Sequence, residues 1–569
     1  MKKKIINAVV IALSSMLLLS GCSGSTKDKK TSNPTKVSNI KDEYYTANDP
    51  SKNPVKDSNR QNTFVATISE PGGVFVPYFY DNGWDGNAID PIFASLVATD
   101  EKGNPVADLA EKWEISSDNL TYTYHLRKNL KFSDGSPLTA NDVAFTLTIL
   151  DDPAYSGYVD ISQAAIKGAE DYKKGKADSI EGIKVVDDNT IKITTEKVNP
   201  LSLTLLGGQV LSKAYYGKDY KRGKLDYLKD LYSKPLGSGP YKLDKYVTGQ
   251  EVRYVANENY YGGKPNIENL IFKVTSKDTA LQLFQTGETD MDGFSTDKDT
   301  IDELKGLGFA NIRIRTIPDY GFIYINNKKS YLKDKAVRQA LIYGLDRQKI
   351  IDVKYNGYGE VANVPTAPMI WSYTEDGVNQ YKFDPNKAKK LLDDAGWKVG
   401  SDGIREKDGK KLKLSYLTSK NTDQTIPVAK EDYKAIGIDF EAEVMDSNTM
   451  FSKLNSGDYD LVGVRTSGLV DPNDSVAEFS SQAPEGQNVS GYSNAKIDEL
   501  IKEGVSTTDI SKRKEIYKKI YQEFSNDPPV ILLDYRKGVS AWNGRIKGIE
   551  NDNFAGISST NLSKLKIQK

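Results

Sequence analysis

The sequence predicts a mixed α/β or α+β protein that is built in several lobes. Its 569 residues exceed what one hydrophobic core supports, so two or three domains are expected. Short runs in which apolar residues alternate, such as 64–68, 190–194 and 251–255, are typical of half-buried strands. Between these runs lie segments with the apolar spacing of amphipathic helices, so strands and helices mix along the chain.

Four of these segments carry the signals of a helix. Thr139 is a candidate N-cap, with an acid at the third helical position. Asp384 is a second candidate cap, and Pro385 follows it at the first helical position, where proline is favoured. Asp334 opens a third helix, and 511–524 has the apolar spacing of a fourth.

The composition is that of a soluble globular protein and disfavours several kinds of chemistry. Hydrophobic residues make up 38% and charged residues 27%, and the formal net charge of −1 gives no sign of a nucleic-acid partner. His125 is the only histidine and lies in the alternating run 121–127, where a structural role in a strand is expected. Histidine-based triads and zinc sites are therefore disfavoured, and no cofactor or metal is expected. Composition leaves carboxylate chemistry open, as in glycosidases.

The first 22 residues have the form of an export signal. Lys2–Lys4 give a basic start, residues 5–19 are apolar, and Leu-Ser-Gly then leads to Cys22, the only cysteine. The apolar run is shorter than the ~20 residues that a spanning helix needs. This ending resembles the lipobox of bacterial lipoproteins, which implies that Cys22 is acylated and becomes the first residue of the mature chain. The alternative is an ordinary secreted protein with a chance cysteine at its cleavage site.

The signal places the rest of the chain outside the cytoplasmic membrane. We expect 1–21 to be a signal peptide and 22–62, which is rich in Ser, Thr, Lys, Asp and Asn, to be a lipidated flexible tether. About 38 residues of such a tether have a root-mean-square reach of roughly 35 Å. No run after Cys22 is long and apolar enough to span a membrane. The expected location is therefore lipid-anchored at the outer face of the bacterial cytoplasmic membrane, or the periplasm.

Eight short sequence motifs, here called blocks, follow one another along the chain in a characteristic order. The first joins 108–114 to the strand-like run 121–127, and the fourth holds 337–341 followed by Asp346-Arg347. The others are 131–143, 237–241, 387–397, 457–460, 471–472 and 491–494. In this order the blocks resemble the extracellular solute-binding family 5, which holds the dipeptide- and oligopeptide-binding proteins of ABC importers. We interpret the blocks as structural elements, such as tight turns and a capped helix, rather than as ligand contacts. They therefore identify the family but not the ligand.

The resemblance implies an α/β clamshell with two lobes, of the periplasmic-binding-protein type (class II, cluster C), with an extra subdomain in lobe one. Two crossovers would join the lobes, near 317–320 and near 533–535, and the ligand would lie in the cleft between the lobes. Carried onto this sequence, lobe one comprises 63–100, 234–317 and 534–569, the extra subdomain is 101–233, and lobe two is 318–533.

The resemblance also implies a binding function without enzymatic chemistry. The protein would capture a peptide or another small solute outside the cell, close over it and present it to an ABC permease. A separate ATPase subunit would hydrolyse ATP, because this chain has no Gly-x-x-x-x-Gly-Lys-Ser/Thr motif. We expect a monomer that is held at the membrane by its lipid. The alternatives are the same fold with an oligosaccharide, an opine or a metallophore as ligand, and an enzyme or cell-surface chaperone on this scaffold.

The ligand class depends on the segment before Asp471. In peptide-binding relatives, an aspartate three residues before this acid typically holds the peptide amino group, and a tryptophan stands six residues before it. This sequence has Gly468 and Arg465 at those places, so Asp471 or Asp474 could supply the charge instead. Segment 166–183 resembles the peptide-binding branch, and 34 tyrosines suit a cleft that packs varied side chains. A nickel chelate is disfavoured because a second histidine is missing.

The expected ligand-binding residues lie on two facing walls. A strand from Arg465 to Leu469 on lobe two would pair with the backbone of an extended peptide, and Gly468 would allow close approach. Arg465 could bind a ligand carboxylate through its forked guanidinium. The alternative places Arg465 in a surface ion pair and the aromatic residues of lobe one in the core. The expected set is Arg465, Thr466, Ser467, Gly468, Leu469 and Asp471 on lobe two, with Tyr78, Tyr80 and Trp84 on lobe one.

Overall fold

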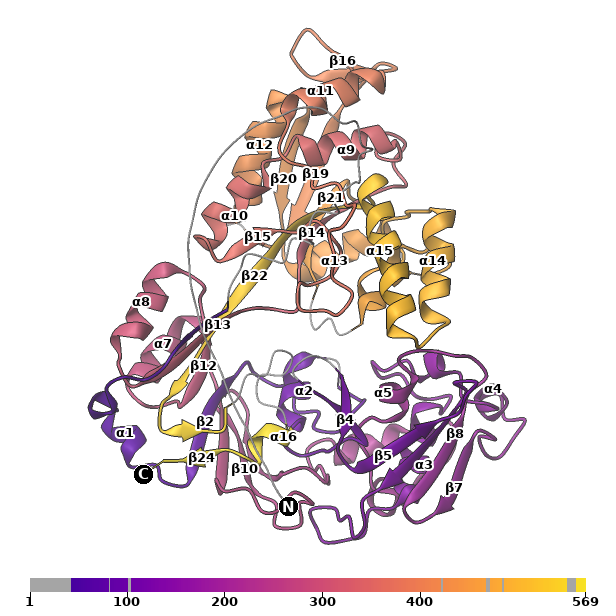
Figure 1. Ribbon diagram of the computed structural model, residues 1–569, viewed down its shortest axis with the longest axis vertical. Helices are drawn as coiled ribbons and strands as arrows, with labels where there is room; N and C mark the ends of the chain where they lie inside the picture. Colours follow the sequence, from indigo (N-terminus) through magenta and orange to yellow (C-terminus); the bar gives the residue numbers. More distant parts are fainter. Residues whose placement is uncertain are drawn as a thin grey trace, which may run out of the picture.

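The chain forms two lobes of mixed strands and helices, one above the other in Figure 1, as expected for a two-lobed clamshell. The computed structural model describes residues 42–80, 82–100, 104–420, 423–466, 471–483, 486–549 and 559–568. Cys22, the signal peptide and the first part of the expected tether lie outside the described residues. In the described part of the chain, we find no helix with the length and the apolar character of a membrane span.

The long strand β22 (Val530–Asn543) runs through both lobes and belongs to both of their sheets (Figure 1). Its first half pairs with β14 (Gly321–Ile325) of the upper lobe. Its second half pairs with β12 (Met291–Phe294) and β13 (Ala310–Thr316) of the lower lobe. Residues 317–320 link β13 to β14 beside it, so the chain passes between the lobes twice at nearly the same place.

Each lobe has a parallel set of strands within this sheet. In the upper lobe, β19 runs parallel to both β20 and β21, and in the lower lobe β2 runs parallel to both β11 and β12. The order is β20-β19-β21-β14-β22-β12-β2-β11-β10-β9. The strands not yet given are β2 (Thr63–Ile68), β9 (Tyr241–Val247), β10 (Glu251–Ala256), β11 (Asn269–Val274), β19 (Lys413–Thr418), β20 (Asp439–Val444) and β21 (Leu461–Arg465).

The side chains of β14 point alternately into two hydrophobic cores of the upper lobe. Phe322 and Tyr324 belong to one core, whereas Ile323 and Ile325 belong to the other, because successive side chains of a strand point to opposite faces. The first core is covered by α13 (Ser447–Ser456), α14 (Ala495–Val505) and α15 (Ile510–Asn526). The second is covered by α9 (Lys335–Tyr343), α11 (Pro385–Asp394) and α12 (Thr425–Ala435).

The lower lobe carries a second, smaller sheet in the order β5-β6-β8-β7. Its residues and those of the lower half of the large sheet share one continuous core, so this subdomain is packed onto the lobe. His125 lies in β6, half-buried, with its Nε2 atom 3.2 Å from Oε1 of Glu114. The elements of the subdomain are β5 (Ala110–Ile115), β6 (Thr121–Leu126), α3 (Ala140–Leu150), β7 (Ile183–Asp187) and β8 (Thr190–Thr194).

The helix starts expected from the sequence are confirmed. Thr139 forms a complete capping box with the acid three residues later at the start of α3. Asp334 and Asp384 accept hydrogen bonds from the first turns of α9 and α11, and Pro385 is the first residue of α11. The fourth expected helix, 511–524, is contained in α15.

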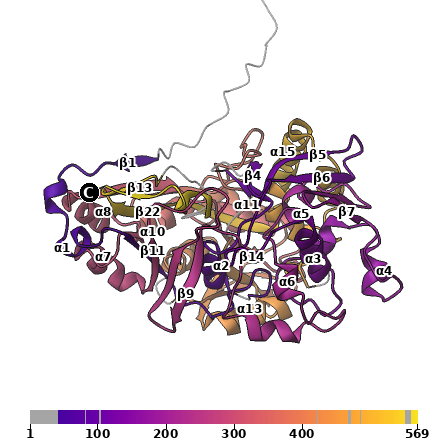
Figure 2. The ribbon, with the colours of Figure 1, turned by 90° about the horizontal axis from the view of Figure 1, so that it is seen from below.

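Residues 42–62, expected to belong to the flexible tether, are folded onto the lower lobe. Strand β1 (Glu43–Tyr45) pairs with β13, as Figure 2 shows, and α1 (Val55–Ser58) follows. The carboxylates of Asp57 and Asp290 are fully buried, and Arg60 lies between them, with one nitrogen 3.0 Å from Asp290 and also paired with Asp57. The expectation is wrong for this stretch, because backbone pairing and buried ion pairs fix a segment that has few apolar side chains.

Substitution of Arg60 tests this attachment. Burial and the neighbouring Asp290 raise the pKa of Asp57, so its ionised form depends on nearby cations. We expect Arg60→Ala to lower the free energy of unfolding by about 3 kcal/mol, because it leaves a buried charge without a partner. The loss should be greater at pH 8 than at pH 5, where Asp57 can take up a proton. Chemical denaturation measures both values.

A matched control removes a cation from an exposed pair on the same lobe. Lys229 lies 2.6 Å from Asp226, and both side chains are mostly in solvent. Lys229→Ala should leave the unfolding free energy nearly unchanged, because solvent screens an exposed ion pair. Equal effects of the two substitutions would show that 42–62 contributes no folded structure.

Candidate functional site

The carboxyl ends of the parallel strands in the two lobes define the candidate site. In open sheets with parallel strands, ligands bind beyond these ends. In the lower lobe, residues 69–82 follow β2 and lead into α2 (Gly83–Ile89). In the upper lobe, α13 begins shortly after the end of β20. Figures 1 and 2 place α2 and α13 on the sides of the lobes that face each other, so both sets of strand ends look into the same space.

Arg465, the last residue of β21, lies where the chain passes between the lobes. Its guanidinium donates to Oδ1 of Asp319 at 2.8 Å, in the link from β13 to β14. It also donates to Asp534, in the middle of β22, and to the hydroxyl of Tyr355 at 2.8 Å. Arg536 binds the other oxygen of Asp319 at 2.8 Å. We call Asp319, Lys354, Tyr355, Arg465, Asp534 and Arg536 the crossover cluster.

The carboxylates of the crossover cluster are buried, and that of Asp534 stays ionised. Asp534 is fully buried and Asp319 is 3% exposed. Burial acts to raise the pKa of Asp534, but the charges of Arg465 and of Lys354, which is 3.4 Å away, hold it below its ordinary value. The guanidinium of Arg465 is thus neutralised by two carboxylates of the protein itself. A ligand carboxylate would have to compete with both.

The rest of the expected strand is only partly described. Thr466 continues β21 by one residue, since its N–H donates to the carbonyl of Tyr320 and its hydroxyl accepts from the N–H of Tyr320, each at 3.0 Å. Ser467, Gly468 and Leu469 lie outside the described residues. The part that is described is therefore joined to the backbone of the first crossover.

Asp471 is buried and engaged within the upper lobe. Both of its oxygens accept hydrogen bonds from Arg513 at 2.8 Å, and one of them also accepts from the N–H of Asn473. The guanidinium of Arg513 also lies over the ring of Trp371, at 5.1 Å from its centre. This bidentate pair neutralises Asp471, so the acid caps the short 3-10 helix Pro472–Ser475 rather than presenting a free charge.

The three aromatic residues expected on the lower lobe differ in their surroundings. Tyr78 is in the core, with a positive φ of 73° and its hydroxyl 2.6 Å from the carbonyl of Gln209. Tyr80 is half-buried, and its ring stacks on Tyr158 of the extra subdomain at 4.5 Å between centres. Trp84 is the second residue of α2 and is 47% exposed. Tyr80 and Trp84 thus reach the surface near α2, whereas Tyr78 positions the loop.

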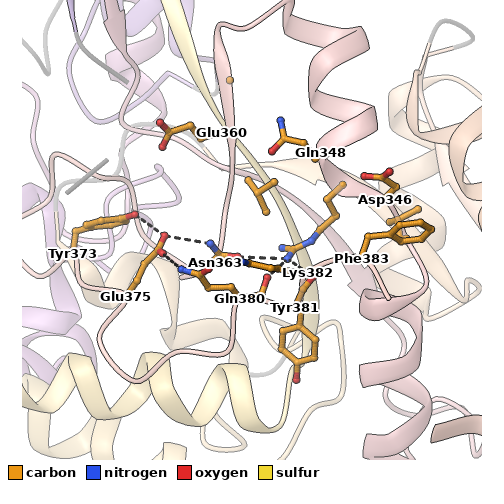
Figure 3. A pocket seen from close by; sticks show the side chains of 14 residues that line it. Asp346, Gln348, Glu360, Asn363, Tyr373, Glu375, Gln380, Tyr381, Lys382 and Phe383 are labelled. Carbon is orange, nitrogen blue, oxygen red and sulfur yellow. Dashed lines mark hydrogen bonds between the residues drawn. The ribbon is translucent and has the colours of Figure 1, made fainter. Parts of the chain in front are cut away.

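A cavity of about 390 Å³ lies within the upper lobe, beside β22 (Figure 3). Arg347 is buried in its wall and donates to four backbone carbonyls, those of residues 362, 380, 381 and 532. Glu375 accepts hydrogen bonds from Tyr373, Asn363 and Gln380, as the dashed lines in Figure 3 show. These polar groups hold the wall segments together, and we assign no ligand to this cavity.

Comparison with known proteins gives the family. The model of the bacterial extracellular solute-binding proteins, family 5 (middle region), matches residues 104–487. The chain is 30% identical over 495 residues to the oligopeptide-binding protein AppA of Bacillus subtilis, covering 85% of this chain and 88% of the relative. It is 29% identical over 554 residues to heme-binding protein A of Haemophilus influenzae, covering 91% and 96%.

A solved structure agrees with this match. The structure of AppA from Bacillus subtilis in complex with a nonapeptide superposes with a TM-score of 0.74 at 26% identity, covering 90% of this chain and all of the other. Members of this family are binding components of transporters and not enzymes. The chain therefore belongs to the bacterial extracellular solute-binding proteins of family 5.

Proposed function

We propose that this protein is the membrane-anchored solute-binding component of an ABC importer, which captures peptides between its lobes and delivers them to the permease. One observation carries the proposal: the parallel strand ends of two lobes face each other, and within the described residues the chain passes from one lobe to the other through 317–320 and through β22. The peptide-binding relatives supply the ligand class.

We propose to keep the lobe limits expected from the sequence. Lobe one would comprise 63–100, 234–317 and 534–569 with the extra subdomain 101–233, and lobe two 318–533; the segment 42–62 joins lobe one, because β1 pairs with β13. The partners of β22 support a change of lobe near the expected limit, because β22 pairs with the upper-lobe strands β14 and β15 (Gly359–Val361) up to Arg536 and with the lower-lobe strand β13 from Lys537 onward. The buried clusters support it as well, since the cores of the upper lobe lie between residues 320 and 535.

In the proposed mechanism, ligand binding shifts an equilibrium between open and closed lobes. A few backbone angles in two connections absorb such a motion, and the binding energy of a ligand that contacts both lobes favours the closed state. The crossover cluster ties β21, the first crossover and β22 to one another. We propose that these three segments move as one body and that bending occurs on the lower-lobe side of Arg536.

A non-peptide solute is the second candidate, and the heme-binding relative favours it, because its similarity covers 91% of this chain. An oligosaccharide, an opine or a metallophore belongs to the same alternative. Native mass spectrometry of protein purified from its own host discriminates the two. A retained mass that fragments into amino-acid residues supports the peptide proposal, and any other retained solute contradicts it.

Ligand-induced closure is the first prediction. Small-angle scattering should give a smaller radius of gyration when a saturating peptide is added, because the lobes approach each other. Thermal stability should rise as well, by roughly 2.7 kcal/mol at a hundredfold excess over Kd. A peptide that binds tightly and leaves the scattering curve unchanged would contradict the clamshell mechanism.

Anchoring through Cys22 is the second prediction. Cys22→Ala removes the acylation site, so we expect the protein to leave the membrane fraction for the medium or the periplasm while ligand affinity stays the same. One acyl chain alone holds a protein only marginally, so the anchor depends on the complete lipid modification. Retention of the variant at the membrane after a high-salt wash would refute lipid anchoring.

The role of Arg465 is the third prediction. Arg465→Ala leaves Asp319 and Asp534 with fewer cations, and we expect a loss of about 3–5 kcal/mol in the unfolding free energy of the upper lobe. Lys453→Ala, which breaks a more exposed pair with Glu443, serves as the control and should leave the unfolding free energy nearly unchanged, because solvent screens that pair. Chemical denaturation of both variants measures this difference.

Calorimetry with a free-acid peptide and its C-terminal amide separates the two roles of Arg465. If the residue only holds the crossovers, the ratio of the two affinities should be the same in wild type and variant. A selective loss of about tenfold for the free acid, which is ~1.4 kcal/mol, would instead assign Arg465 to the ligand carboxylate.

A further inference from the structure

Asp90 presents a carboxylate that the protein does not neutralise. It ends α2, and its backbone N–H completes the helix by donating to the carbonyl of Gly86. Its side chain reaches solvent, and among the described residues we find no hydrogen bond or ion pair to its oxygens. This differs from Asp471 and Asp534, whose charges are matched by Arg513 and Arg465.

Two tyrosine rings, Tyr80 and Tyr158, lie by the helical turn that precedes Asp90. The hydroxyl of Tyr80 lies against Gly86, one helical turn before Asp90, and a Cβ atom at residue 86 would be only 3.0 Å from it. Tyr80 also donates to the hydroxyl of Tyr158 at 2.6 Å. Burial raises the pKa of Tyr158 most, and the charge of Asp90 raises it further, which places the two groups within electrostatic reach.

The rings leave an open aromatic surface. Tyr158 is 54% exposed although it is stacked on Tyr80. The faces of aromatic rings carry negative potential and attract cations such as an ammonium group. A carboxylate next to such rings is a combination that suits a positively charged group.

The surrounding loop is held rigidly. Tyr78 keeps a left-handed backbone conformation, and its carbonyl accepts a hydrogen bond from Tyr155 at 3.0 Å. Asp85 accepts hydrogen bonds from the N–H groups of Gly73 and Val74 at 2.8 and 3.2 Å. Groups that are already fixed lose little freedom when a ligand binds, which strengthens binding.

We propose that Asp90, with Tyr80 and Tyr158, binds a primary ammonium group of the ligand. The ammonium is the free amino terminus of a peptide or the side chain of a lysine within it. This inference rests on the proposed peptide-binding function and assigns the recognition of positive charge to lobe one. It fits the position of α2 on the side of the lower lobe that faces the upper lobe (Figure 1).

The site has a defined dependence on pH. Although the side chain is exposed, the protein around it partly desolvates the carboxylate, and this desolvation raises the pKa of Asp90 to about 7. The groups whose charges interact with it are the hydroxyls of Tyr80, Tyr158 and Tyr254, which stay neutral in this range. An ammonium ligand binds the ionised carboxylate, so its affinity should rise between pH 5.5 and pH 7.5, below the range in which a free amino terminus has lost most of its own proton.

Calorimetry with three probe peptides tests the proposal: tetra-alanine, N-acetyl tetra-alanine, and N-acetyl tetrapeptides of alanine with one lysine at each position in turn. We expect Asp90→Asn to weaken at least one ammonium-bearing probe by about tenfold or more at pH 7.5, because charge-assisted hydrogen bonds are the strong ones. The acetylated probe without lysine should change by less than about twofold, and the pH dependence should disappear in the variant.

The probes distinguish the two sources of the ammonium. A loss for tetra-alanine identifies the amino terminus, and a loss confined to lysine probes identifies a side chain. Tyr158→Leu, which removes the ring, should weaken the same probe by about threefold. Asp244→Asn alters an exposed carboxylate in β9 of the same lobe and should leave all affinities unchanged.

Two results would overturn the proposal, and they are distinguishable. If the probes bind wild type but Asp90→Asn affects the acetylated and the ammonium probes alike, the ammonium site is refuted and the peptide-binding function stands. If no probe binds wild-type protein, both the peptide-binding function and the ammonium site fall together. Thermal melting of each variant confirms that the comparison is made between folded proteins.

Discussion

The buried carboxylate of Asp534 is the constraint on which the arrangement of the two lobes depends. It lies in the middle of β22, the strand that both lobes share, and it has no exposure to solvent. A charge in that position is tolerated only if cations meet it there. Arg465 and Lys354 do so, and Arg465 at the same time binds Asp319 in the other connection between the lobes. Arg465 therefore holds both connections between the lobes to the upper lobe.

Local signals in the sequence were sufficient for the elements and for the family, but not for the partners of charged residues. The cap at Thr139 and the start of α11 at Pro385 depend on neighbours within four residues, so a sequence pattern contains them. The partner of Arg465 in the first crossover is 146 positions away, and that of Asp471 is 42 positions away. Only the tertiary fold brings these residues together, and the one available signal was an acid in each crossover.

The N-terminal segment is a second case in which the sequence pattern did not reveal tertiary contacts. Its composition predicts a flexible tether up to residue 62, because few apolar side chains are present to bury. Strand pairing needs only backbone N–H and C=O groups, which every residue except proline provides, and β1 obtains its partners from β13. The buried pair between Asp57 and Arg60 adds a tertiary contact that composition does not reveal. The folded body therefore includes 42–62, about twenty residues that the sequence assigned to the tether.

The distribution of charge between the lobes suggests how recognition and motion are separated. Near the facing strand ends of the upper lobe, Arg465 and Asp471 are both matched by charges of the protein, so ligand binding does not have to break a buried pair there. Asp90 on the lower lobe has no such partner among the described residues. An unpaired carboxylate costs stability through desolvation, and a bound cation removes that cost. Under our proposal, the lower lobe recognises the charge of the ligand, while the charged residues of the upper lobe hold the connections through which the two lobes close.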